Sequence, residues 1–442
     1  MATQNSVWND MPAINRDLLA PLSAISGRYL ALVCCLTAVV AAGAGAWLYQ
    51  IQTGIGQTNM HAPIFWSSYI ASFVYWIGVS HSGTFISGVL RLTKAEWRRP
   101  VTRIAELMTI ISVMIAGLCV FFHLGRVWRW YYLLPYPNQR EIWPDFRSPL
   151  MWDATAIFTY ATASTIYLYL PLIPDFALAR DRVEGWRRPI YSLLCLGWKG
   201  SQREWETLNT AIRIITPLIV MVMISVHSIV GWDFGMSLVP GWHTSIIAPY
   251  FVVGAVHSGL GMVAIGLYIV RRTYGWEQYI RQEHFDKMGK LLVVTTLTLA
   301  YLYFADQLTV WYGKKPDEMA ILHSLMTGDF AVPFWVMIAL IYVLPLTFLT
   351  NPTFRAWPLG MLCMGIGINV GMYVERALIL VPPLTHPRLT YQWSQYFPSW
   401  IELTILAGVL ALAALLYVLL SKFVPLISIW EEKEGRLHAA AR

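Results

Sequence analysis

Long apolar stretches recur along this chain, and they constrain its fold more than any other feature of the sequence. A helix that crosses a bilayer needs about 20 predominantly apolar residues. Ten stretches qualify: 29–49, 64–90, 104–124, 150–173, 211–231, 245–270, 289–311, 333–350, 357–380 and 400–420. They are continuous runs, whereas a membrane β-barrel shows short alternating segments. The sequence therefore predicts an all-α polytopic membrane protein with ten transmembrane helices.

The composition excludes other classes of protein. Hydrophobic residues make up 57% of the 442 residues and charged residues 13%, which is about half of the ~25% charged share of an ordinary globular chain. A disordered chain, a disulfide scaffold and a soluble α/β enzyme are therefore excluded. The five cysteines form no C-x-x-C pattern, so we expect no iron–sulfur cluster, attached haem or zinc ribbon. No cleavable signal peptide is indicated.

Lysine and arginine in the connecting segments predict the orientation, because cytoplasmic connections carry an excess of these residues. With the N-terminus inside, the inner segments hold 24 of the 32 Lys and Arg residues. We therefore predict that both termini are cytoplasmic. The same distribution accounts for the net charge of +7 without a nucleic-acid partner.

Aromatic residues are concentrated in two of the outer connections. One interpretation is an aromatic belt at the level of the lipid headgroups. The other is a docking platform for a large partner on the outer face, which rigid aromatic side chains favour. The residues are Trp128, Trp130, Tyr131, Tyr132 and Trp143 (with Pro135, Pro137 and Pro144) after the third stretch, and Tyr391, Trp393, Tyr396 and Trp400 before the tenth.

An internal repeat indicates two four-helix units. His81-Ser82-Gly83 in the second stretch matches His257-Ser258-Gly259 in the sixth. The following stretches also correspond: the third and seventh end with a titratable residue, the fourth and eighth open with Pro and Trp, and the fifth and ninth carry an early Pro and a late acid. Because four is an even number of crossings, both units run in the same direction, as a parallel repeat about the membrane normal. Chance similarity among apolar segments is the alternative.

We therefore predict two parallel four-helix bundles, formed by spans 2–5 and 6–9, with spans 1 and 10 at the periphery. The predicted segments are 1–28 (cytoplasmic N-terminal segment), 29–63 (peripheral helix and outer loop), 64–231 (first bundle), 232–380 (second bundle), 381–420 (outer loop and peripheral helix) and 421–442 (cytoplasmic tail).

Ionisable side chains inside a membrane cost ~2.5–3.5 kcal/mol on insertion scales and usually mark a pathway or a site. One group lies at the outer ends of neighbouring predicted helices, and a second group lies deeper. The outer group is His123, Arg126, Asp153, His227, Asp233 and Asp306; the deeper group is His81, Glu106, His257, Glu375, Arg376 and Glu402.

His123 and Asp153 are the strongest candidates for chemistry. They lie on consecutive antiparallel helices joined on the outer side, so their side chains are expected to meet, and Arg126 is expected one turn beyond His123 on the same face. A histidine held by a carboxylate accepts a proton near neutral pH. With aromatic side chains beside them, these groups suit a quinol, which has two hydroxyls to deprotonate and a ring to stack. The alternative for His123 is an interfacial histidine, and for Asp233 and Asp306 it is a helix-end carboxylate in water.

A proton route is a further hypothesis, for which the candidates are His81 and Glu106 in the first bundle and His257, Asp306 and Glu375 in the second. Glu106 and His123 lie 17 residues apart on one predicted helix, or ~25 Å at 1.5 Å per residue, and His81 on the adjacent helix could lie between them. The alternative is that Glu106 pairs with Arg103 at the inner interface. Haem ligation by the intramembrane histidines is disfavoured, because no predicted span contains two of them.

These features resemble the NrfD-type membrane subunits, such as that of polysulfide reductase. The closer resemblance, over nearly the whole chain, is to the ActC-type subunits of alternative complex III, a bacterial quinol-oxidising respiratory complex. The resemblance rests on the ten spans, the two His-Ser-Gly motifs, His123-Leu124-Gly125-Arg126, Met151-Trp152-Asp153 and Gly231-Trp232-Asp233.

The resemblance implies a bacterial inner-membrane subunit without metal, which binds menaquinol or ubiquinol near the outer surface through His123 and Asp153, with Asp233 as a third candidate. It also implies three partners: a periplasmic-side iron–sulfur protein, a multihaem c-type cytochrome and a homologous NrfD-like membrane subunit. Two alternatives stay open, namely the sister subunit of the ActF type, which is not expected to bind quinol, and a secondary transporter. The outer position of the acids favours the quinol interpretation over transport.

Overall fold

The computed structural model describes residues 11–134 and 149–440, and within these ranges the chain forms helices and no β-strand. Nine of the described helical segments are long and apolar enough to cross a membrane. They match nine of the ten predicted stretches, which confirms a polytopic all-α membrane protein. They are α3 (Gly27–Thr53), α5 (Arg99–His123), α6 (Pro149–Arg180), α8 (Gln202–Gly235), α9 (Ile247–Tyr274), α10 (Gln282–Gly313), α12–η4–α13 (Ala331–Ile338, Ala339–Val343, Leu344–Phe348), α15 (Pro358–Thr385) and α16 (Trp400–Leu420).

The stretch predicted as the second span forms helix α4 (Ser68–Leu92), which is not among these nine and is the most enclosed of the long helices. Of its 25 residues, 21 are buried, so protein rather than lipid surrounds it. Its polar side chains find partners inside the bundle, as when the Ser80 Oγ donates to the Thr109 carbonyl at 2.9 Å. At ~1.5 Å per residue α4 is long enough to cross a bilayer, and the count of ten spans stays a prediction.

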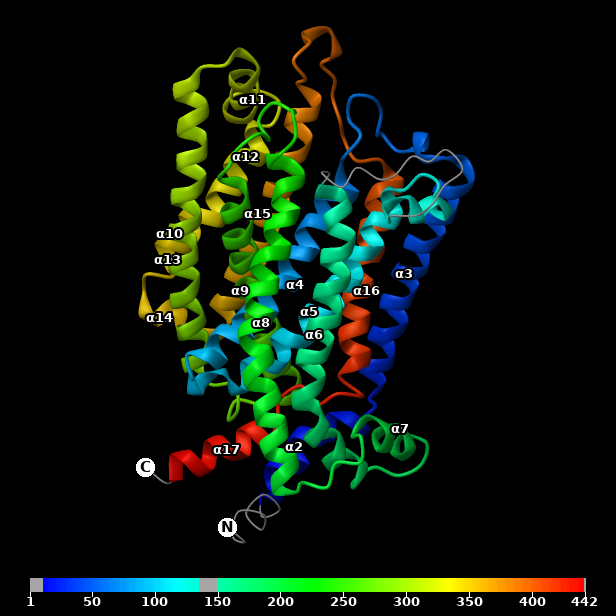
Figure 1. Cartoon of the computed structure of the whole chain (residues 1–442), viewed down its shortest axis with the longest axis vertical. Helices are drawn as coiled ribbons and strands as arrows, with labels where there is room; N and C mark the ends of the chain where they lie inside the picture. The colour runs from blue at the N-terminus through cyan, green and yellow to red at the C-terminus, as the bar shows by residue number, and fades with distance from the viewer. Residues whose placement is uncertain (1–10, 135–148, 441–442) are drawn as a thin grey trace.

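The shorter elements connect the long helices or lie at the ends of the bundle. They are α2 (Pro12–Ser23), η1 (Ile55–Gln57), η2 (Glu96–Arg98), η3 (Val127–Leu133), α7 (Arg187–Leu194), α11 (Pro316–Met326), α14 (Pro352–Arg355), η5 (Thr390–Gln392) and α17 (Ile429–Ala440). Helices α2, α7 and α17 lie at the end of the bundle where both chain termini are found, and α11 lies at the opposite end (Figure 1). We call these the inner and the outer end; which of them faces the cytoplasm stays a prediction.

Two groups of four helices show the same pattern of packing. In the first, α4 packs against α5 and α8, and α6 packs against α5 and α8. In the second, α9 packs against α10 and α15, while the α12–η4–α13 segment packs against the same two helices. This is the pattern expected of two corresponding four-helix units, and their parallel repeat stays a prediction. The predicted boundary at residue 231 falls inside α8, which continues to Gly235.

The two His-Ser-Gly motifs meet where α4 crosses α9 at the centre of the molecule (Figure 1). A Cβ added to Gly259 would lie 1.4 Å from the Ser82 Oγ. Only glycine therefore permits this approach of the two helices. The motif that indicated the repeat thus forms the contact between the two groups.

Helices α3 and α16 pack against each other and flank the first group. Gly43 and Gly408 face one another so closely that a Cβ on Gly43 would lie 2.8 Å from the Gly408 Cα. Small residues of this kind allow membrane helices to approach without polar contacts. At the outer end Glu402 is fully buried and accepts hydrogen bonds from the hydroxyls of Ser68 at 2.7 Å and Tyr396 at 2.5 Å. Glu402 therefore attaches α16 to α4.

Candidate functional site

Two carboxyl groups face each other near the outer end of the first group. Asp153 is the fifth residue of α6, and Asp233 lies in the last turn of α8. Their side chains are hydrogen-bonded to one another, and the Oδ1 atom of each is buried without a further partner among the described residues. A hydrogen bond between two carboxyl groups requires one proton between them. This pair can therefore hold or release a proton inside a largely buried site.

His123 is the last residue of α5 and is half-buried, and its Nδ1 atom has no hydrogen-bond partner within the described ranges. The expected contact between His123 and Asp153 is not made, because the partner of Asp153 is Asp233. Helix α6 packs more extensively along α8 than along α5, which brings the Asp153 carboxyl to α8. The structure thus places three candidate groups at the ends of three packed helices, and each has a buried polar atom without a hydrogen-bond partner among the described residues.

Arg126 does not lie on the same helical face as His123. Helix α5 ends at His123, and Leu124 has an extended backbone with φ of −71° and ψ of 105°. Arg126 consequently stands in the following connection with an exposed side chain. Among the described residues it forms no ion pair with Asp153 or Asp233. Residues 135–148 lie outside the described ranges, so the predicted platform residues Trp143, Pro135, Pro137 and Pro144 have no structural account.

Deeper in the first group, two histidines are in contact. His81 and His227 are fully buried, and their ring centroids are 4.9 Å apart. The His81 ring also stacks on Tyr160 at 4.1 Å, and its Nδ1 lies 2.6 Å from the Ile77 carbonyl oxygen. Both ring nitrogens of His227 are buried without a hydrogen-bond partner in the described part of the chain. His227 precedes Asp233 by six residues on α8, or ~9 Å of axial rise, so it lies below the carboxyl pair rather than in it.

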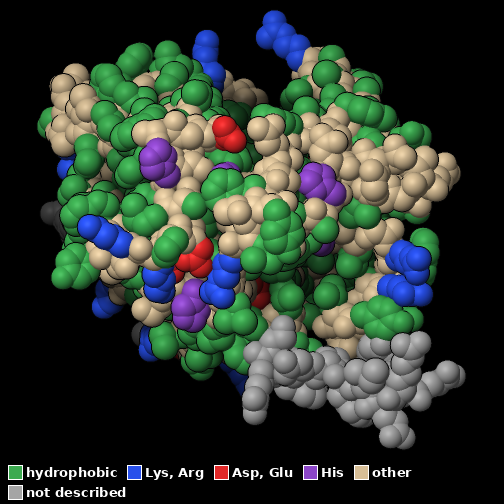
Figure 2. Space-filling view, turned by 90° about the horizontal axis from the view of Figure 1, so that it is seen from above, with side chains coloured by type: hydrophobic (Ala, Val, Ile, Leu, Met, Phe, Trp, Pro, Cys, Tyr) green, Lys and Arg blue, Asp and Glu red, His purple; other side chains and the backbone are tan. Residues whose placement is uncertain are grey.

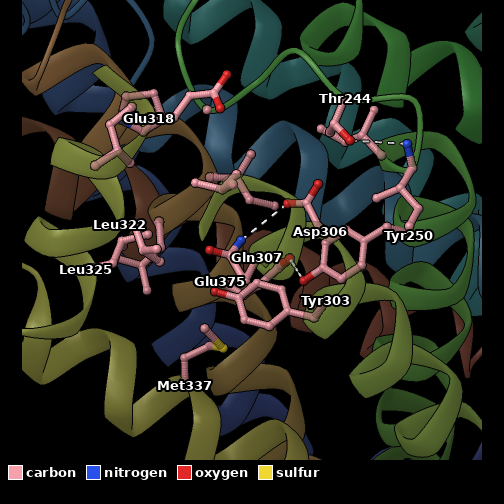
Figure 3. A pocket seen from close by; sticks show the side chains of 18 residues that line it. Thr244, Tyr250, Tyr303, Asp306, Gln307, Glu318, Leu322, Leu325, Met337 and Glu375 are labelled. Atoms are coloured by element: carbon pink, nitrogen blue, oxygen red, sulfur yellow. Dashed lines mark hydrogen bonds between the residues drawn. The ribbon is translucent and has the colours of Figure 1, made fainter. Parts of the chain in front are cut away.

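The second group contains a cavity with a mostly apolar lining that also includes Asp306 of α10 and Glu375 of α15 (Figure 3). Its volume is about 80 Å³, which admits several water molecules but is below the ~300–1,000 Å³ of typical small-molecule pockets. The Tyr250 hydroxyl donates to Glu375 at 2.5 Å, and the Gln307 amide donates to Asp306 at 3.3 Å. Two predicted proton-path residues therefore share one cavity.

Glu375 is also paired with its neighbour in sequence. The Arg376 Nη1 lies 3.3 Å from the Glu375 Oε2, and both side chains are 2% exposed. The Arg376 guanidinium stands over the Phe251 ring at 4.3 Å. His257 is separate from this pair: its Nδ1 lies 2.9 Å from the Thr295 Oγ1, and its Nε2 is buried without a partner among the residues described. The structure therefore does not connect His257 directly to Glu375 or Asp306.

Comparison with known proteins identifies the family. Residues 56–388 match the family described as polysulphide reductase, NrfD. The chain belongs to the NrfD family. The match covers both groups of four helices and ends just after α15, so it includes His123, Asp153 and Asp233 and the two residues Asp306 and Glu375 that share the cavity.

Three relatives of the chain are membrane subunits. One from Halobacterium salinarum, provisionally named as a membrane subunit of dimethyl sulfoxide reductase, is 25% identical over 95% of both chains. An Hdr-like menaquinol oxidoreductase integral membrane subunit from Archaeoglobus fulgidus is 22% identical over 90% of this chain and 94% of its own length. The integral membrane subunit of a menaquinone reductase from Nitratidesulfovibrio vulgaris is 24% identical over 40% of this chain and 43% of its own length.

At the inner end of this NrfD-family chain, Glu106 is held by three side chains. It accepts a hydrogen bond from Ser87 at 2.6 Å, and it lies 3.9 Å from both Arg91 and Arg103. The pairing with Arg103 that the sequence offered as an alternative is therefore confirmed. The Ser87 hydroxyl also lies 3.1 Å from the Tyr167 hydroxyl, so a polar contact leads from Glu106 into the bundle.

Two acids at this end were not singled out by the sequence. Asp175 binds Arg103 at 3.0 Å and accepts backbone N–H groups from Ile429 and Trp430. Glu431 of α17 binds Arg91 at 2.7 Å and Arg98 at 2.8 Å. Asp175 was missed because the predicted span ends at residue 173, whereas α6 continues to Arg180. Glu431 stands in a polar tail, and nothing in the local sequence indicates that it is buried.

No group of three or more His, Cys, Asp or Glu side chains in the described ranges is placed to hold a metal ion. The intramembrane histidines stand singly or, as with His81 and His227, in a ring-to-ring contact.

Proposed function

We propose that this chain is the membrane subunit of a respiratory quinol-oxidising complex. Menaquinol or ubiquinol binds near the outer end of the first group, between α5, α6 and α8. The observation that supports this most is the pairing of Asp153 with Asp233, each with one oxygen that has no further hydrogen-bond partner in the described ranges, at the same end of the bundle as the unpartnered Nδ1 of His123. The names of two relatives, a menaquinol oxidoreductase subunit and a menaquinone reductase subunit, support the choice of substrate.

In quinol oxidation the main chemical role of this chain is to accept protons. Oxidation of a quinol to the quinone releases two protons and two electrons. His123 accepts the proton of one hydroxyl, and the Asp153–Asp233 pair accepts the proton of the other, since general bases within hydrogen-bonding reach lower the barrier to this transfer. The electrons pass one at a time to iron–sulfur clusters in a partner docked on the outer face, and onward to the haems of a multihaem c-type cytochrome.

The outer face offers a surface for such a partner. Hydrophobic side chains cover much of this end, and few acidic side chains show (Figure 2). Several large aromatic residues of this face are exposed: Trp128 is 62% exposed, Tyr391 80% and Trp400 62%. Rigid aromatics are enriched at the centres of protein interfaces. We assign these residues to the contact with the iron–sulfur protein, beside a homologous NrfD-like subunit in the same complex.

Proton translocation through the first group is a second candidate function, favoured by a series of buried hydroxyls. Above Glu106, Ser87 and Tyr167 form one polar level. One helix turn further along α4, Thr84 lies 2.9 Å from the Tyr160 hydroxyl, and Tyr160 stacks on His81. This series leads from the inner end toward His227 and the carboxyl pair. In the second group Asp306 and Glu375 share the cavity and would carry protons through that group. His257 is a third candidate and is not connected to these two residues.

Substitution of the proposed bases tests the function. In the purified complex, His123→Ala and Asp153→Asn are each expected to lower the rate of quinol oxidation by ~10²-fold or more, the usual scale for loss of a positioned acid or base. His323→Ala and Asp329→Asn, which change exposed residues at the outer end of the second group, are expected to leave the rate unchanged.

The alternatives give different outcomes in the same experiment. A sister subunit that binds no quinol would keep a near-normal rate in both His123→Ala and Asp153→Asn while the complex assembles. A transporter would purify without an electron-transfer partner and would show solute-dependent uptake in vesicles. Either result would overturn the assignment of the quinol site to this chain.

A further inference from the structure

Helix α7 at the inner end presents an apolar face that is largely exposed. Trp186, Ile190 and Leu193 recur at helical spacing, and Trp186 is 63% and Leu193 75% exposed. Leu196, just beyond the helix, is 68% exposed. Arg187 and Arg188 stand in the first turn. A short helix with one apolar face and basic residues beside it is typical of a segment lying at the boundary between headgroups and acyl chains, so α7 marks the level of the inner headgroups.

A groove of about 370 Å³ opens at this same end, between the last turns of α6, the connection from α7 to α8, and α17. Three basic residues and three tryptophans line it, together with a single acid. The basic residues are Arg180, Lys199 and Lys433, the tryptophans are Trp198, Trp205 and Trp430, and the acid is Asp181.

The lining of the groove is positively charged, because it holds three basic side chains and one acid. The Arg180 Nε and Nη2 atoms bind the two carboxylate oxygens of Asp181 at 2.8 and 3.2 Å, so the single acid is engaged by one of the three bases. Lys433 is 1% exposed. Burial, with Arg182 nearby, lowers the pKa of Lys433 to about 8, although Asp175 acts in the opposite direction. An anion in the groove would favour the charged form of this lysine.

The aromatic wall of the groove is fixed in place. The Trp198 and Trp205 rings meet edge to face at 5.0 Å, and Trp205 contacts Trp430 at 5.4 Å. The Trp430 indole N–H donates to the Pro171 carbonyl at 3.0 Å. Tryptophan is enriched at membrane interfaces, where its ring packs on the glycerol and upper acyl region. A preformed basic and aromatic groove at headgroup level is the arrangement that receives an anionic lipid.

We propose that this groove binds the phosphate headgroup of an anionic phospholipid from the inner leaflet. Lys199 and Lys433 contact the phosphate, the three tryptophans contact the glycerol region, and the acyl chains run along the apolar side of α7. Because α17 supplies Trp430 and Lys433, the bound lipid also holds the C-terminal helix against α6 and α8. The proposal is independent of the proposed quinol chemistry.

Native mass spectrometry of the intact complex tests this, with phosphatidylglycerol or phosphatidylcholine added to the detergent. The parent is expected to retain phosphatidylglycerol in preference to phosphatidylcholine. The double variant Lys199→Gln/Lys433→Gln is expected to bind phosphatidylglycerol about 30-fold more weakly, since a basic residue near the membrane surface contributes ~1 kcal/mol. The matched control is Lys94→Gln/Arg272→Gln, which removes the same charge from exposed residues at the inner end and is expected to bind like the parent.

The single variant Lys199→Gln keeps the proposal testable if loss of the buried Lys433 impairs folding. Lys199 is exposed, and its replacement is expected to weaken phosphatidylglycerol binding about 5-fold. Equal retention of phosphatidylglycerol by Lys199→Gln and by the Lys94→Gln/Arg272→Gln control would overturn the proposal. Complete displacement of the lipid by millimolar inorganic phosphate would also overturn it, because the groove would then be a site for the free anion.

Discussion

The buried acids at the two ends of the first group of helices have opposite kinds of partner. At the inner end Glu106, Asp175 and Glu431 each lie within 4 Å of at least one arginine. At the outer end Asp153 and Asp233 lie against one another. A guanidinium favours the charged form of a neighbouring acid and the pair holds helices together, whereas two facing acids must share a proton. The inner acids are therefore suited to structure and the outer pair to proton transfer.

The inner ion pairs also explain how the C-terminal helix is positioned. The N-terminus of α17 donates two backbone N–H groups to Asp175, and Glu431, one residue further on, reaches Arg91 and Arg98. A carboxylate at a helix N-terminus is favourable because of the unsatisfied N–H groups there. Helix α17 thus covers the inner end of the first group, below Glu106.

The contrast between the two ends depends most on the orientation of the chain, and a test of the orientation has an all-or-none result. A cysteine introduced as Arg436→Cys lies on α17, where Arg436 is exposed. In sealed cells we expect no labelling by a membrane-impermeant maleimide added from outside, and full labelling after the membrane is opened. The control is Tyr391→Cys, at the outer end and 80% exposed in the parent, which is expected to label in sealed cells. The reverse pattern would place the acid pair on the cytoplasmic side.

Loss of Glu431 is expected to have the largest effect on stability. Removing one partner of a buried ion pair typically costs ~3–5 kcal/mol, so Glu431→Ala should lower the thermal unfolding midpoint of the detergent-solubilised protein by several degrees. Glu434→Ala, a half-buried neighbour on α17, is the control and should change it little. A midpoint equal to that of the parent would show that α17 is not held by these ion pairs.

The pH dependence of this contribution has a definite sign. Burial acts to raise the pKa of Glu431, but Arg91 and Arg98 outweigh it and hold the pKa at about 2, below the ordinary 4.5. A depressed pKa means that the stabilisation is complete above the unfolded value and is lost as the pH falls toward about 2. The difference in stability between the parent and Glu431→Ala is therefore expected to be constant between about pH 6 and 8.

The sequence predicted the helices well because their signal is local. Runs of about 20 apolar residues suffice to place a membrane helix, and even the polar α4 was found, since its serines and His81 are interspersed with apolar residues. Which side chains meet across helices is a different matter, because it depends on rotation and tilt that no local pattern contains. The motif at Gly259 indicated a repeat but not the close contact with Ser82. The pairing of Asp153 with Asp233, rather than with His123, is the clearest example.

The acids at the inner end show the same limit of prediction from sequence. Glu106 was recognised because it stands inside an apolar run, and its contact with Arg103 was foreseen because both lie on one helix at i, i+3. Asp175 and Glu431 are 256 residues apart in the sequence but belong to one cluster of charges around Arg91 and Arg103. Long-range contacts of this kind become visible only when the chain is folded.

Glu106 has features of both kinds of acid. It contacts arginines, as the structural acids do, but it is also the first group in the series of buried hydroxyls. If protons enter there, Glu106→Gln should lower the number of protons translocated per electron in reconstituted vesicles while quinol oxidation persists. Glu277→Gln, an exposed acid at the inner end, is the control. An unchanged ratio with Glu106→Gln would remove it from the mechanism and leave it with the structural role of its neighbours.

Substitution of Arg126 is expected to have the smallest effect on quinol oxidation. A small effect would support the contrast between the two ends, because it would show that the outer acids work without a basic partner. The Arg126 side chain is exposed and, among the described residues, makes no ion pair with the acid pair. Exposed charges typically contribute ~0–1 kcal/mol to an interaction, so Arg126→Gln should raise the KM for quinol by about 5-fold or less and leave kcat unchanged. Arg129→Gln, an exposed arginine in the same connection, is the matched control. A loss in kcat approaching that of Asp153→Asn would show that Arg126 moves onto the bound quinol, and the outer acids would then have a basic partner like those of the inner end.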